Sequence, residues 1–347
     1  MKKILMFLDY YNVGGIERII NDLSCNIKNY KIDILSFVNK SGDRKVISLL
    51  NNNYRNFAIR NIFGLKKLRK YLKNNKYDII HIHCYNSFGL IYAYIARKYV
   101  KKIIVHGHNS GIDKDKFKIK KIINLLIKNL FSKKEYIYIA CTNDISKFCF
   151  KNKFVNIIPN AVDYSKFYFN KQDRLKYRKL FNISDNDIII GHIGRFEKQK
   201  NHEFLIEIFK KICEINDNYK LVLIGEGTLL ENIKNKVLEY NLLDKVIFLN
   251  NRYDINNLIN MFDIYVFPSL YEGFPLTVLE SQINGCLVIV SNRVSKNLKI
   301  SNKLVFLPLE NKDIWIKEII RKRNKKVVLN NKLDLKNYVE KINEIYF

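Results

Sequence analysis

Short apolar runs alternate with longer stretches of helical periodicity along most of the chain. In the first half the apolar runs are short enough for buried strands, and they span residues 4–8, 32–37, 77–83, 103–106 and 136–141. Between them hydrophobic residues recur every three or four positions, as in 16–27 and 63–72, which predicts helices with one apolar face. This alternation predicts an α/β fold with a doubly wound parallel sheet.

The same alternation restarts in the second half, after a polar and charged stretch at 164–186. Strands are predicted at 187–193, 221–224, 246–249, 264–267, 287–290 and 304–307, and helices begin near Ile314 and Leu335. A chain of 347 residues is long enough for two such domains, which we place at 1–170 and 171–333. Ligands of parallel sheets bind at the carboxyl ends of the strands, so the residues directly after each strand are the site candidates.

The chain is strongly basic, because Lys+Arg 61 against Asp+Glu 33 give a net charge of +28. Nucleic acid, anionic membranes and phosphorylated substrates are all physically compatible with this charge. The basic residues are spread among asparagines and are not interleaved with aromatic residues in a nucleic-acid-reading motif. We therefore expect no nucleic-acid partner, and genome composition explains part of the excess charge equally well.

The cysteines and the hydropathy of the chain favour a cytoplasmic protein. The six cysteines form no C-x-x-C pair, and Cys84, Cys141 and Cys286 lie in or beside apolar runs, as buried thiols do in a reducing compartment. No stretch approaches 18 uninterrupted apolar residues, and the start of the chain lacks a small-residue cleavage site.

One basic amphipathic stretch, 114–134, suits a membrane surface. Such a helix can lie on anionic lipid at the inner face of the plasma membrane as a peripheral contact, or it can pack its apolar stripe on its own sheet. Both interpretations stay open from the sequence. The stretch 66–76 adds a second basic surface. The apolar stripe, flanked by lysines, is Ile119, Ile122, Ile123, Leu126, Ile127 and Leu130.

Two glutamates follow the predicted strand 264–267. Pro268 stops the strand, Glu272 lies in the loop, and Pro275 stands where the first residue of a helix belongs. In that helix Glu280 falls beside the apolar stripe, where a carboxylate is costly unless something satisfies it. Both glutamates can therefore point into one crevice, although a salt-bridged core Glu280 and a solvated Glu272 are the plainer alternative. The stripe itself is Leu276, Leu279 and Ile283.

A basic loop follows the first strand of the second half. Gly194 and Arg195 come directly after that strand, and Lys200 precedes a helix that Asn201 could cap. Two cations beside a helix amino end suit a diphosphate, though an ordinary basic loop would look the same. Glycine turns that permit close approach of a ligand recur at Gly14, Gly15, Gly225 and Gly227.

Two strands of the first half each end in a His-x-His: His81 with His83, and His106 with His108. Alternation along a strand puts both members of a pair on one side. Zinc is one interpretation of this group, but no cysteine or carboxylate joins the histidines at ligand spacing. We therefore expect structural histidines and no metal site.

The stretch 263–286 resembles the donor-site signature of the family 4 retaining glycosyltransferases of GT-B fold. The resemblance rests on Glu-Gly-Phe-Pro at 272–275, on the seven residues between the two glutamates, and on the preceding Asp-x-x-x-x-Pro-Ser. It implies that Glu280 hydrogen-bonds the ribose of a sugar nucleotide. It also implies that Glu272, with the backbone of Gly273 and Phe274, holds hydroxyls of the transferred sugar.

The resemblance covers nearly the whole chain and implies roles for the other loops. Arg195 and Lys200 would clamp the diphosphate, and His108 would reach the reacting sugar. Arg252 stands near the place of base recognition, but the glycine usual in the family is absent there, so the nucleobase stays unassigned. The glycines expected beside the donor are Gly14, Gly15, Gly194, Gly225 and Gly227.

The resemblance also implies an architecture and a reaction. Two Rossmann-like domains would face a central cleft, and a last helix at about 334–347 would pack back on the first domain. The reaction would move a sugar from a UDP- or GDP-sugar to a glycan or lipid-linked saccharide acceptor, with retention and without a metal ion, in bacterial capsule, exopolysaccharide or lipopolysaccharide synthesis. A sugar-nucleotide epimerase, a phosphorylase of the same fold, and a non-catalytic nucleic-acid or membrane-binding protein are the alternatives.

Overall fold

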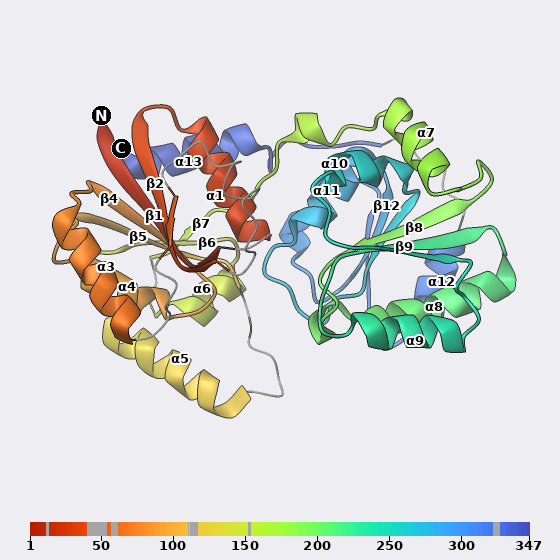
Figure 1. The fold of residues 1–347 in the computed structure, drawn as a ribbon, viewed down its shortest axis with the longest axis horizontal. Coiled ribbons are helices and arrows are strands. Elements are labelled where there is room, and N and C mark those ends of the chain that lie inside the picture. The colour runs from red at the N-terminus through yellow and green to blue at the C-terminus, as the bar shows by residue number, and fades with distance from the viewer. Residues whose placement is uncertain are drawn as a thin grey trace. The chain divides into compact units, whose positions relative to one another are not determined.

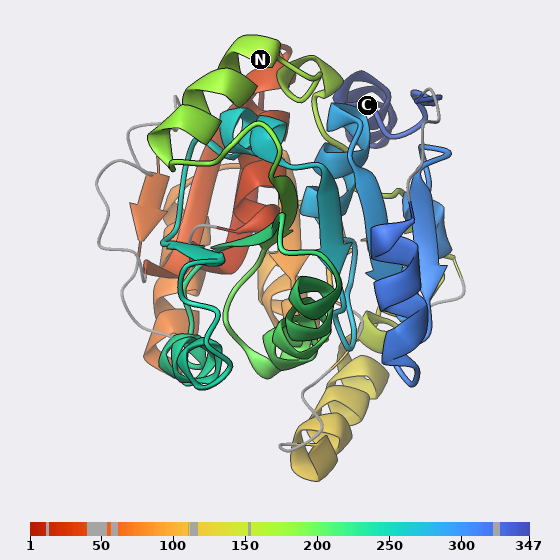
Figure 2. The same cartoon turned by 90° about the vertical axis from the view of Figure 1, so that its right-hand side faces the viewer.

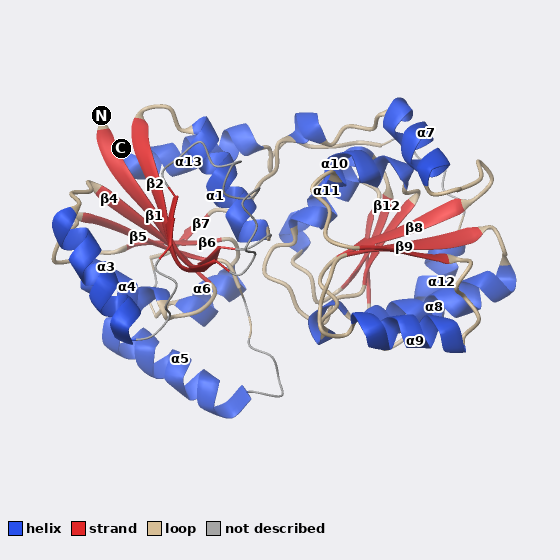
Figure 3. Cartoon of the chain, viewed as in Figure 1, coloured by secondary structure: helices blue, strands red, loops and turns tan. Residues whose placement is uncertain are grey.

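The computed structural model describes residues 1–11, 14–39, 54–56, 62–109, 111, 117–151, 154–321 and 327–347. They form two compact units (Figure 1). The first comprises Met1–Ala161 with Leu335–Phe347, and the second comprises Val162–Asp334. Each unit is a parallel sheet with helices packed on it (Figure 3), which is the α/β fold class that the sequence predicts.

The sheet of the first unit has seven strands in the order β3-β2-β1-β4-β5-β6-β7. The strands are β1 (Lys2–Tyr11), β2 (Tyr30–Asn39), β3 (Tyr54–Asn56), β4 (Ile79–Cys84), β5 (Lys102–Gly107), β6 (Ile137–Ala140) and β7 (Asn156–Ile157). The helices are α1 (Gly15–Asn26), α3 (Ile62–Asn74), α4 (Gly89–Ala96), α5 (Phe117–Phe131), α6 (Asn143–Cys149) and α13 (Leu335–Tyr346). The chain's last helix, α13, packs beside α1 (Figure 1).

The central strands of this sheet are buried on both faces, which explains why they are nearly unbroken apolar runs in the sequence. Every residue of β4 is buried, including its two histidines. The edge strands β3 and β7 were not predicted. They are too short to carry an apolar run of their own, and they exist because β2 and β6 offer them a ladder of hydrogen bonds.

The sheet of the second unit has six strands in the order β10-β9-β8-β11-β12-β13. They are β8 (Ile188–Ile193), β9 (Tyr219–Ile224), β10 (Val246–Leu249), β11 (Ile264–Phe267), β12 (Leu287–Ser291) and β13 (Leu304–Leu307). The main helices are α7 (Lys171–Leu180), α8 (His202–Ile215), α9 (Leu230–Glu239), α10 (Ile255–Leu258), α11 (Leu276–Asn284) and α12 (Lys312–Ile320). Fully buried Phe196, Phe209 and Trp315 belong to the core beneath α8 and α12.

The boundary between the units falls after Ala161, earlier than the position near 170 that the sequence suggested. The reason is packing of the segment that follows. Tyr164 is buried and its hydroxyl donates to the Asn330 carbonyl at 3.0 Å. Phe167 is also buried, and its carbonyl accepts from Asn284 Nδ2 at 3.3 Å. These aromatic residues tie the connecting segment to the second unit.

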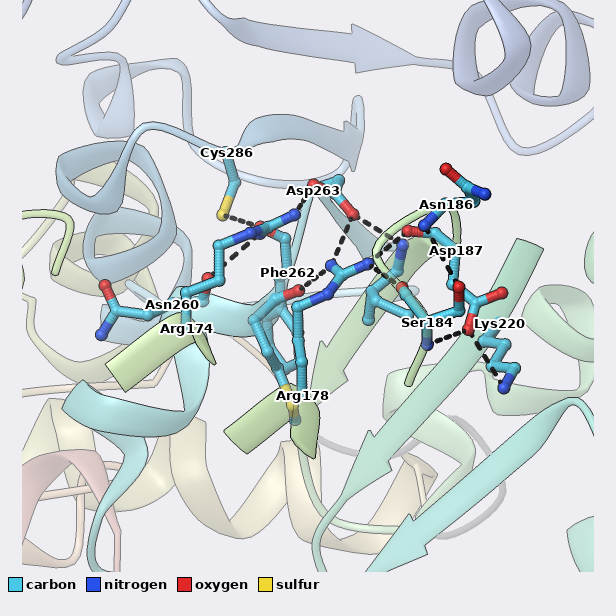
Figure 4. A network of polar contacts seen from close by, with 12 residues as sticks. Arg174, Arg178, Ser184, Asn186, Asp187, Lys220, Asn260, Phe262, Asp263 and Cys286 are labelled. Atoms are coloured by element: carbon cyan, nitrogen blue, oxygen red, sulfur yellow. Dashed lines mark hydrogen bonds and ion pairs between the residues drawn. The ribbon is translucent and has the colours of Figure 1, made fainter. Parts of the chain in front are cut away.

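Asp263, the first residue of the Asp-x-x-x-x-Pro-Ser pattern, holds α7 against the sheet (Figure 4). Its carboxylate pairs with Arg174 at 2.6 Å and with Arg178 at 3.4 Å, and it accepts the Ile189 amide at 2.8 Å. The Arg178 guanidinium is buried and also donates to the Ser184 carbonyl. Asp263 precedes β11, so it lies at the end of that strand opposite Pro268, and its role in the pattern is structural.

No helix in the described part of the chain is long and apolar enough to cross a bilayer.

Candidate functional site

The carboxyl edge of the second sheet carries two glycine turns that lie against each other. The Gly194 amide donates to the Ile224 carbonyl at 2.9 Å, and the Gly225 amide donates to the Leu249 carbonyl at 2.9 Å. A Cβ on Gly225 would lie 2.2 Å from the Gly194 oxygen, and one on Gly227 would lie 2.5 Å from the Phe196 oxygen. Only glycine allows this approach of backbone to backbone.

Lys200 and Glu272 meet at this edge from the two loops that the sequence singled out. Lys200 Nζ lies 2.6 Å from Glu272 Oε1, and the two side chains are only 15% and 8% exposed. The ammonium lies 4.6 Å from the centre of the Phe267 ring. A Cβ on Gly194 would lie 3.1 Å from Lys200 Cδ, so that glycine leaves room for the lysine stem. The structure therefore brings the expected phosphate ligand and the expected sugar ligand into one buried ion pair.

The two loops are also joined by backbone and amide contacts. The Leu270 amide donates to the Gln199 carbonyl at 2.9 Å, and Gln199 Nε2 donates to the Tyr271 carbonyl at 2.9 Å. Asn201 does not cap α8 with its side chain, contrary to the prediction. Its φ is 57° and its Nδ2 donates to the Pro268 carbonyl at 3.1 Å, so the side chain ties the loops together instead.

Helix α11 places Glu280 where the periodicity predicted, beside the buried stripe, and the residue is 1% exposed. Pro275 was predicted to be the first residue of this helix. The helix begins instead at Leu276, and Pro275 is the residue before it. Its ψ of 114° is extended, and no side chain caps the amino end. The amides of the first turn therefore lack a side-chain cap at the start of this helix.

The charges of both glutamates act on Tyr265, a residue of β11. Its hydroxyl donates to Thr277 Oγ1 at 2.8 Å, at the start of α11. Burial raises the pKa of this hydroxyl well above its usual value, and the negative charges of Glu280 and Glu272 raise it further. Glu280 follows Thr277 by three residues in α11, and Glu272 lies in the loop between β11 and α11.

Two neutral histidines near Lys200 were not anticipated from the sequence. His192 is fully buried and its Nδ1 donates to the Val266 carbonyl at 2.8 Å, while His202 stacks on Phe196 with ring centroids 4.1 Å apart. Burial lowers the pKa of His192 to about 4 and that of His202 to about 2, and the Lys200 charge lowers both. Lys200 therefore lies among weakly polar, buried groups in addition to Glu272. The only signal in the sequence was the position of His192 two residues before Gly194.

The two candidate arginines differ. Arg195 is exposed on the loop after β8, and within the described residues its guanidinium makes no ion pair. Arg252 is already engaged, because its Nε and Nη2 donate to the two oxygens of Asp254 at 2.8 and 2.7 Å. Tyr177 also donates to Asp254 at 2.7 Å, so this pair anchors the loop after β10 to α7. Contacts of Arg252 with a nucleobase stay a prediction.

In the first unit the four histidines form a ladder between β4 and β5. His81 lies between the Tyr346 hydroxyl at 2.6 Å and His106 Nδ1 at 3.2 Å. His83 Nδ1 lies 3.0 Å from His108 Nε2. All four rings are buried, and burial is the first cause of their lowered pKa values, about 3 for His81 and His108.

Cys141 joins this ladder, which the sequence analysis had missed. Its Sγ lies 3.9 Å from His106 Nε2 and 3.7 Å from His108 Nδ1, and its thiol donates to Asn160 Oδ1 at 3.1 Å. Since the Asn160 oxygen can only accept, a directed chain with neutral rings connects five of these groups: Tyr346 donates to His81, His81 to His106, His106 to the Cys141 sulfur, and that thiol to Asn160.

Among the residues that the structure describes, two groups of three buried side chains have donor atoms at near ligand spacing: His81, His83 and His106, and His106, His108 and Cys141. In each group these atoms lie within 4.8 Å of one another. The rings of His106 and His108 are stacked 4.1 Å apart with an angle of 28°, and their nitrogens already contact other side chains. The absence of a metal site stays a prediction.

The glycine loop of the first unit leads into α1. Gly14 is extended at φ −166° and precedes the helix without a side-chain cap, and Gly15 is its first residue. A Cβ on Gly14 would lie 2.7 Å from Glu17 Oε2. The preceding Asn12 and Val13, and Ser110 after the His108 loop, lie outside the described residues.

Comparison with known proteins matches both halves of the chain. Residues 13–166 match the family described as Glycosyltransferase Family 4, and residues 173–307 match the one described as Glycosyl transferases group 1. The UDP-Gal:alpha-D-GlcNAc-diphosphoundecaprenol alpha-1,3-galactosyltransferase of Escherichia coli is 30% identical over 339 residues, which cover 91% of this chain and 86% of that protein. The putative glycosyltransferase EpsF of Bacillus subtilis (strain 168) is 29% identical over 321 residues, with 88% and 83% covered.

Solved structures agree on the fold. Anabaena HepE, in a crystal structure with UDP and glucose, matches with a TM-score of 0.83 at 16% identity, covering 99% of this chain and 98% of that one. WaaG, a glycosyltransferase involved in lipopolysaccharide biosynthesis, matches with a TM-score of 0.71 at 12% identity, covering 97% of this chain and 93% of that one. The architecture is GT-B, and the chain belongs to the family 4 glycosyltransferases.

Proposed function

We propose that this glycosyltransferase moves a sugar from a nucleotide-diphosphate donor to an acceptor hydroxyl, with retention of configuration and without a metal ion. The observation that carries the proposal is the buried contact of Lys200 with Glu272 at the carboxyl edge of the second sheet. It joins a loop suited to diphosphate with a loop suited to sugar hydroxyls, and Glu280 lies on α11, the helix that follows the second loop.

The second unit would bind the donor through charge and backbone amides. Lys200 and Arg195 would stabilise the diphosphate, which gains negative charge as it leaves. The amide dipoles at the uncapped amino end of α11 would also stabilise negative charge on the diphosphate. Because these groups supply positive potential at the leaving group, the reaction has no need of a divalent cation there.

The glutamates would select the sugar nucleotide. Glu280 would accept hydrogen bonds from the ribose, and Glu272, with the backbone of Gly273 and Phe274, would hold the sugar hydroxyls. In the structure Lys200 neutralises Glu272. When the donor binds, Lys200 would turn toward the phosphate, and the Glu272 oxygens would accept hydrogen bonds from sugar hydroxyls. The Lys200–Glu272 contact would thus be replaced by two contacts with the donor.

His108 would serve the sugar as a neutral group. Its lowered pKa keeps the ring uncharged at physiological pH. Both ring nitrogens face other side chains in the structure, with Nε2 on His83 at 3.0 Å and Nδ1 at 3.7 Å from Cys141. The weaker contact, on Nδ1, is the one that a sugar hydroxyl could replace.

The partners are suggested by the relatives. One relative is named for a UDP-galactose donor and a diphosphoundecaprenol-linked acceptor, and one solved structure contains UDP-glucose. We therefore propose a UDP- or GDP-sugar donor, a glycan or lipid-linked saccharide acceptor, and a role in bacterial surface polysaccharide synthesis. A cytoplasmic protein in peripheral contact with an anionic membrane fits a lipid-linked acceptor.

Purified protein incubated with a panel of UDP- and GDP-sugars tests this reaction. We expect slow donor hydrolysis with one sugar and transfer when a lipid-linked saccharide is added, with the anomeric configuration of the product matching that of the donor by NMR. An epimerised nucleotide sugar, or phosphate-dependent release of sugar phosphate, would favour an epimerase or a phosphorylase instead. An inverted product would contradict retention.

Replacing Glu280 with glutamine should weaken UDP binding by about 10- to 100-fold, because a charged hydrogen bond to ribose is worth roughly 1.5–3 kcal/mol. Isothermal titration calorimetry measures it. Glu239→Gln, an exposed substitution in α9 of the same unit, is the matched control. Unchanged UDP affinity in a Glu280→Gln protein with a native melting curve would remove Glu280 from the donor site.

A further inference from the structure

Helix α5 exposes the apolar side that an amphipathic helix normally buries. It is the helix predicted in the basic amphipathic stretch, and it lies at the outer edge of its unit in both views (Figures 1 and 2). A helix that packs its stripe on a sheet would leave few large apolar side chains in water. The exposed ones are Ile119 at 74%, Ile122 at 58%, Ile123 at 39%, Leu125 at 54%, Leu126 at 53% and Leu130 at 64%.

A buried asparagine is one of the contacts that hold this helix to its unit. Asn124 is buried, and its Oδ1 accepts from the Ser87 amide at 2.9 Å and from the Ser87 hydroxyl at 2.6 Å. Its Nδ2 donates to the Phe148 carbonyl at 3.0 Å. One helical turn further, Ile127 is the stripe residue that is buried. The side of α5 that carries Asn124 and Ile127 therefore faces the unit. Most of the leucines and isoleucines lie on the other side of the helix and face solvent.

Exposed lysines lie beside the exposed stripe, on α5 and just after it. Lys120 and Lys121 are exposed within α5, and Lys134 is exposed just beyond it. Near the carboxyl end of the helix, Phe131 packs against Tyr94, which carries the Arg97 guanidinium 3.8 Å above its ring. A surface hollow of about 360 Å³ beside this end is lined by Arg97, Lys98, Val100, Lys101, Ile103, Glu135 and Tyr136.

We infer that α5 lies in the interfacial layer of an anionic bilayer, with its leucines and isoleucines among the acyl chains and its lysines at the lipid phosphates. Apolar side chains flanked by cations match that layer. A second copy of the chain matches poorly, since the lysines of two facing stripes would repel and the net charge is +28. The inference deepens the proposed function by naming the surface that meets the acceptor's membrane, but its evidence is independent of the donor site.

Co-sedimentation of the full chain with lipid vesicles tests the inference. Wild-type protein should bind vesicles of phosphatidylcholine with about one-third phosphatidylglycerol, bind pure phosphatidylcholine much less, and dissociate as salt is raised. Ile122→Ser with Leu126→Ser should weaken binding at least about tenfold, because two half-exposed apolar side chains no longer enter the acyl layer. Ile215→Ser with Leu238→Ser, at 61% and 56% exposure in the second unit, is the matched control and should bind like wild type.

The charge component has its own pair of variants. Lys120→Glu with Lys121→Glu should abolish the preference for anionic vesicles, whereas Lys299→Glu with Lys317→Glu, exposed in the second unit, should retain it. Wild-type protein that ignores anionic vesicles, or an Ile122 and Leu126 variant that binds like wild type, overturns the inference. So does a concentration-dependent dimer that this variant abolishes, since the occupant would then be a second copy.

The donor site supplies the readout that separates this inference from the proposed function. UDP affinity and donor hydrolysis in solution should be unchanged in the α5 variants, because the substitutions lie in the first unit and outside the loops assigned to the donor. If wild-type protein binds vesicles but turns over no sugar nucleotide, the proposed function is wrong and the membrane inference still holds.

Discussion

Replacing Lys200 with alanine is expected to lower kcat for sugar transfer by about 10²- to 10³-fold, the usual effect of removing one preorganised group that stabilises transition-state charge. The ammonium is paired with Glu272 and lies among the weakly polar side chains of Phe267, His192 and His202, where water screens its charge poorly. Initial-rate kinetics with a saturating donor measures the loss, and Lys220→Ala is the control. Lys220 pairs with Asp187 at 3.1 Å before β8, at the opposite end of the same sheet.

The same substitution will also cost stability, because Glu272 is left 8% exposed without its cation. Breaking a buried ion pair from one side typically costs about 3–5 kcal/mol. Lys200→Met combined with Glu272→Gln removes both charges and should recover most of that stability without recovering activity. If Lys200→Ala turns over at the wild-type rate, or if the double variant does, the diphosphate assignment is wrong.

Acid should unfold this protein at an unusually high pH, since every one of its six histidines is buried. Native pKa values lie below the unfolded value of about 6.5, at about 4 for His192, about 3 for His81 and His108, and about 2 for His202. The unfolded chain therefore binds more protons below pH 6.5. Stability is fully present above that pH and is lost as the pH falls toward the native values.

The expected slope is large, about 1.4 kcal/mol per histidine per pH unit below 6.5. Four of these side chains lie in the first unit, at His81, His83, His106 and His108, and two in the second, so the first unit should lose stability faster. Urea denaturation at pH 7.5, 6.5 and 5.5 measures the effect. The single tryptophan, Trp315, is buried in the second unit and reports on it alone, while far-ultraviolet circular dichroism reports on both.

Replacing one buried histidine should reduce by one the number of protons taken up on unfolding in acid. His83→Asn removes one titrating ring, and we expect the pH dependence of the unfolding free energy to become shallower by about 1.4 kcal/mol per pH unit in acid. A wild-type free energy of unfolding that stays constant between pH 7.5 and 5.5 would show that the rings are accessible to protons in the native state.

Much of the fold could be predicted from the sequence because its strands are buried on both faces. The expected and observed limits coincide for β10, β11 and β13. The edge strands β3 and β7 could not be predicted, since their hydrogen-bonding partners are distant in sequence. Asn201 is a residue type that often caps helices, but its backbone is left-handed and its Nδ2 donates to the Pro268 carbonyl, a partner that only the tertiary structure supplies.

The sequence indicated which loops lie at the candidate site, but not which of their side chains contact one another. Sequence spacing placed Lys200 and Glu272 at the same sheet edge, yet no local pattern indicates that they neutralise each other. Cys141 follows a different strand from the histidines it contacts, so linear spacing hid it. For α5 the periodicity gave the stripe but not the side that faces the sheet, because the Asn124 partners come from other elements.

The central claim is that the loops around Lys200 and Glu272, with Glu280 behind them, hold a sugar nucleotide at the carboxyl edge of the second sheet. A crystal structure of the full chain with UDP tests it most directly. We expect diphosphate oxygens at about 2.7–3.2 Å from Lys200 Nζ and the Arg195 guanidinium, and ribose hydroxyls at the same distance from Glu280. UDP bound at any other edge, with the Lys200–Glu272 ion pair unchanged, would contradict the account.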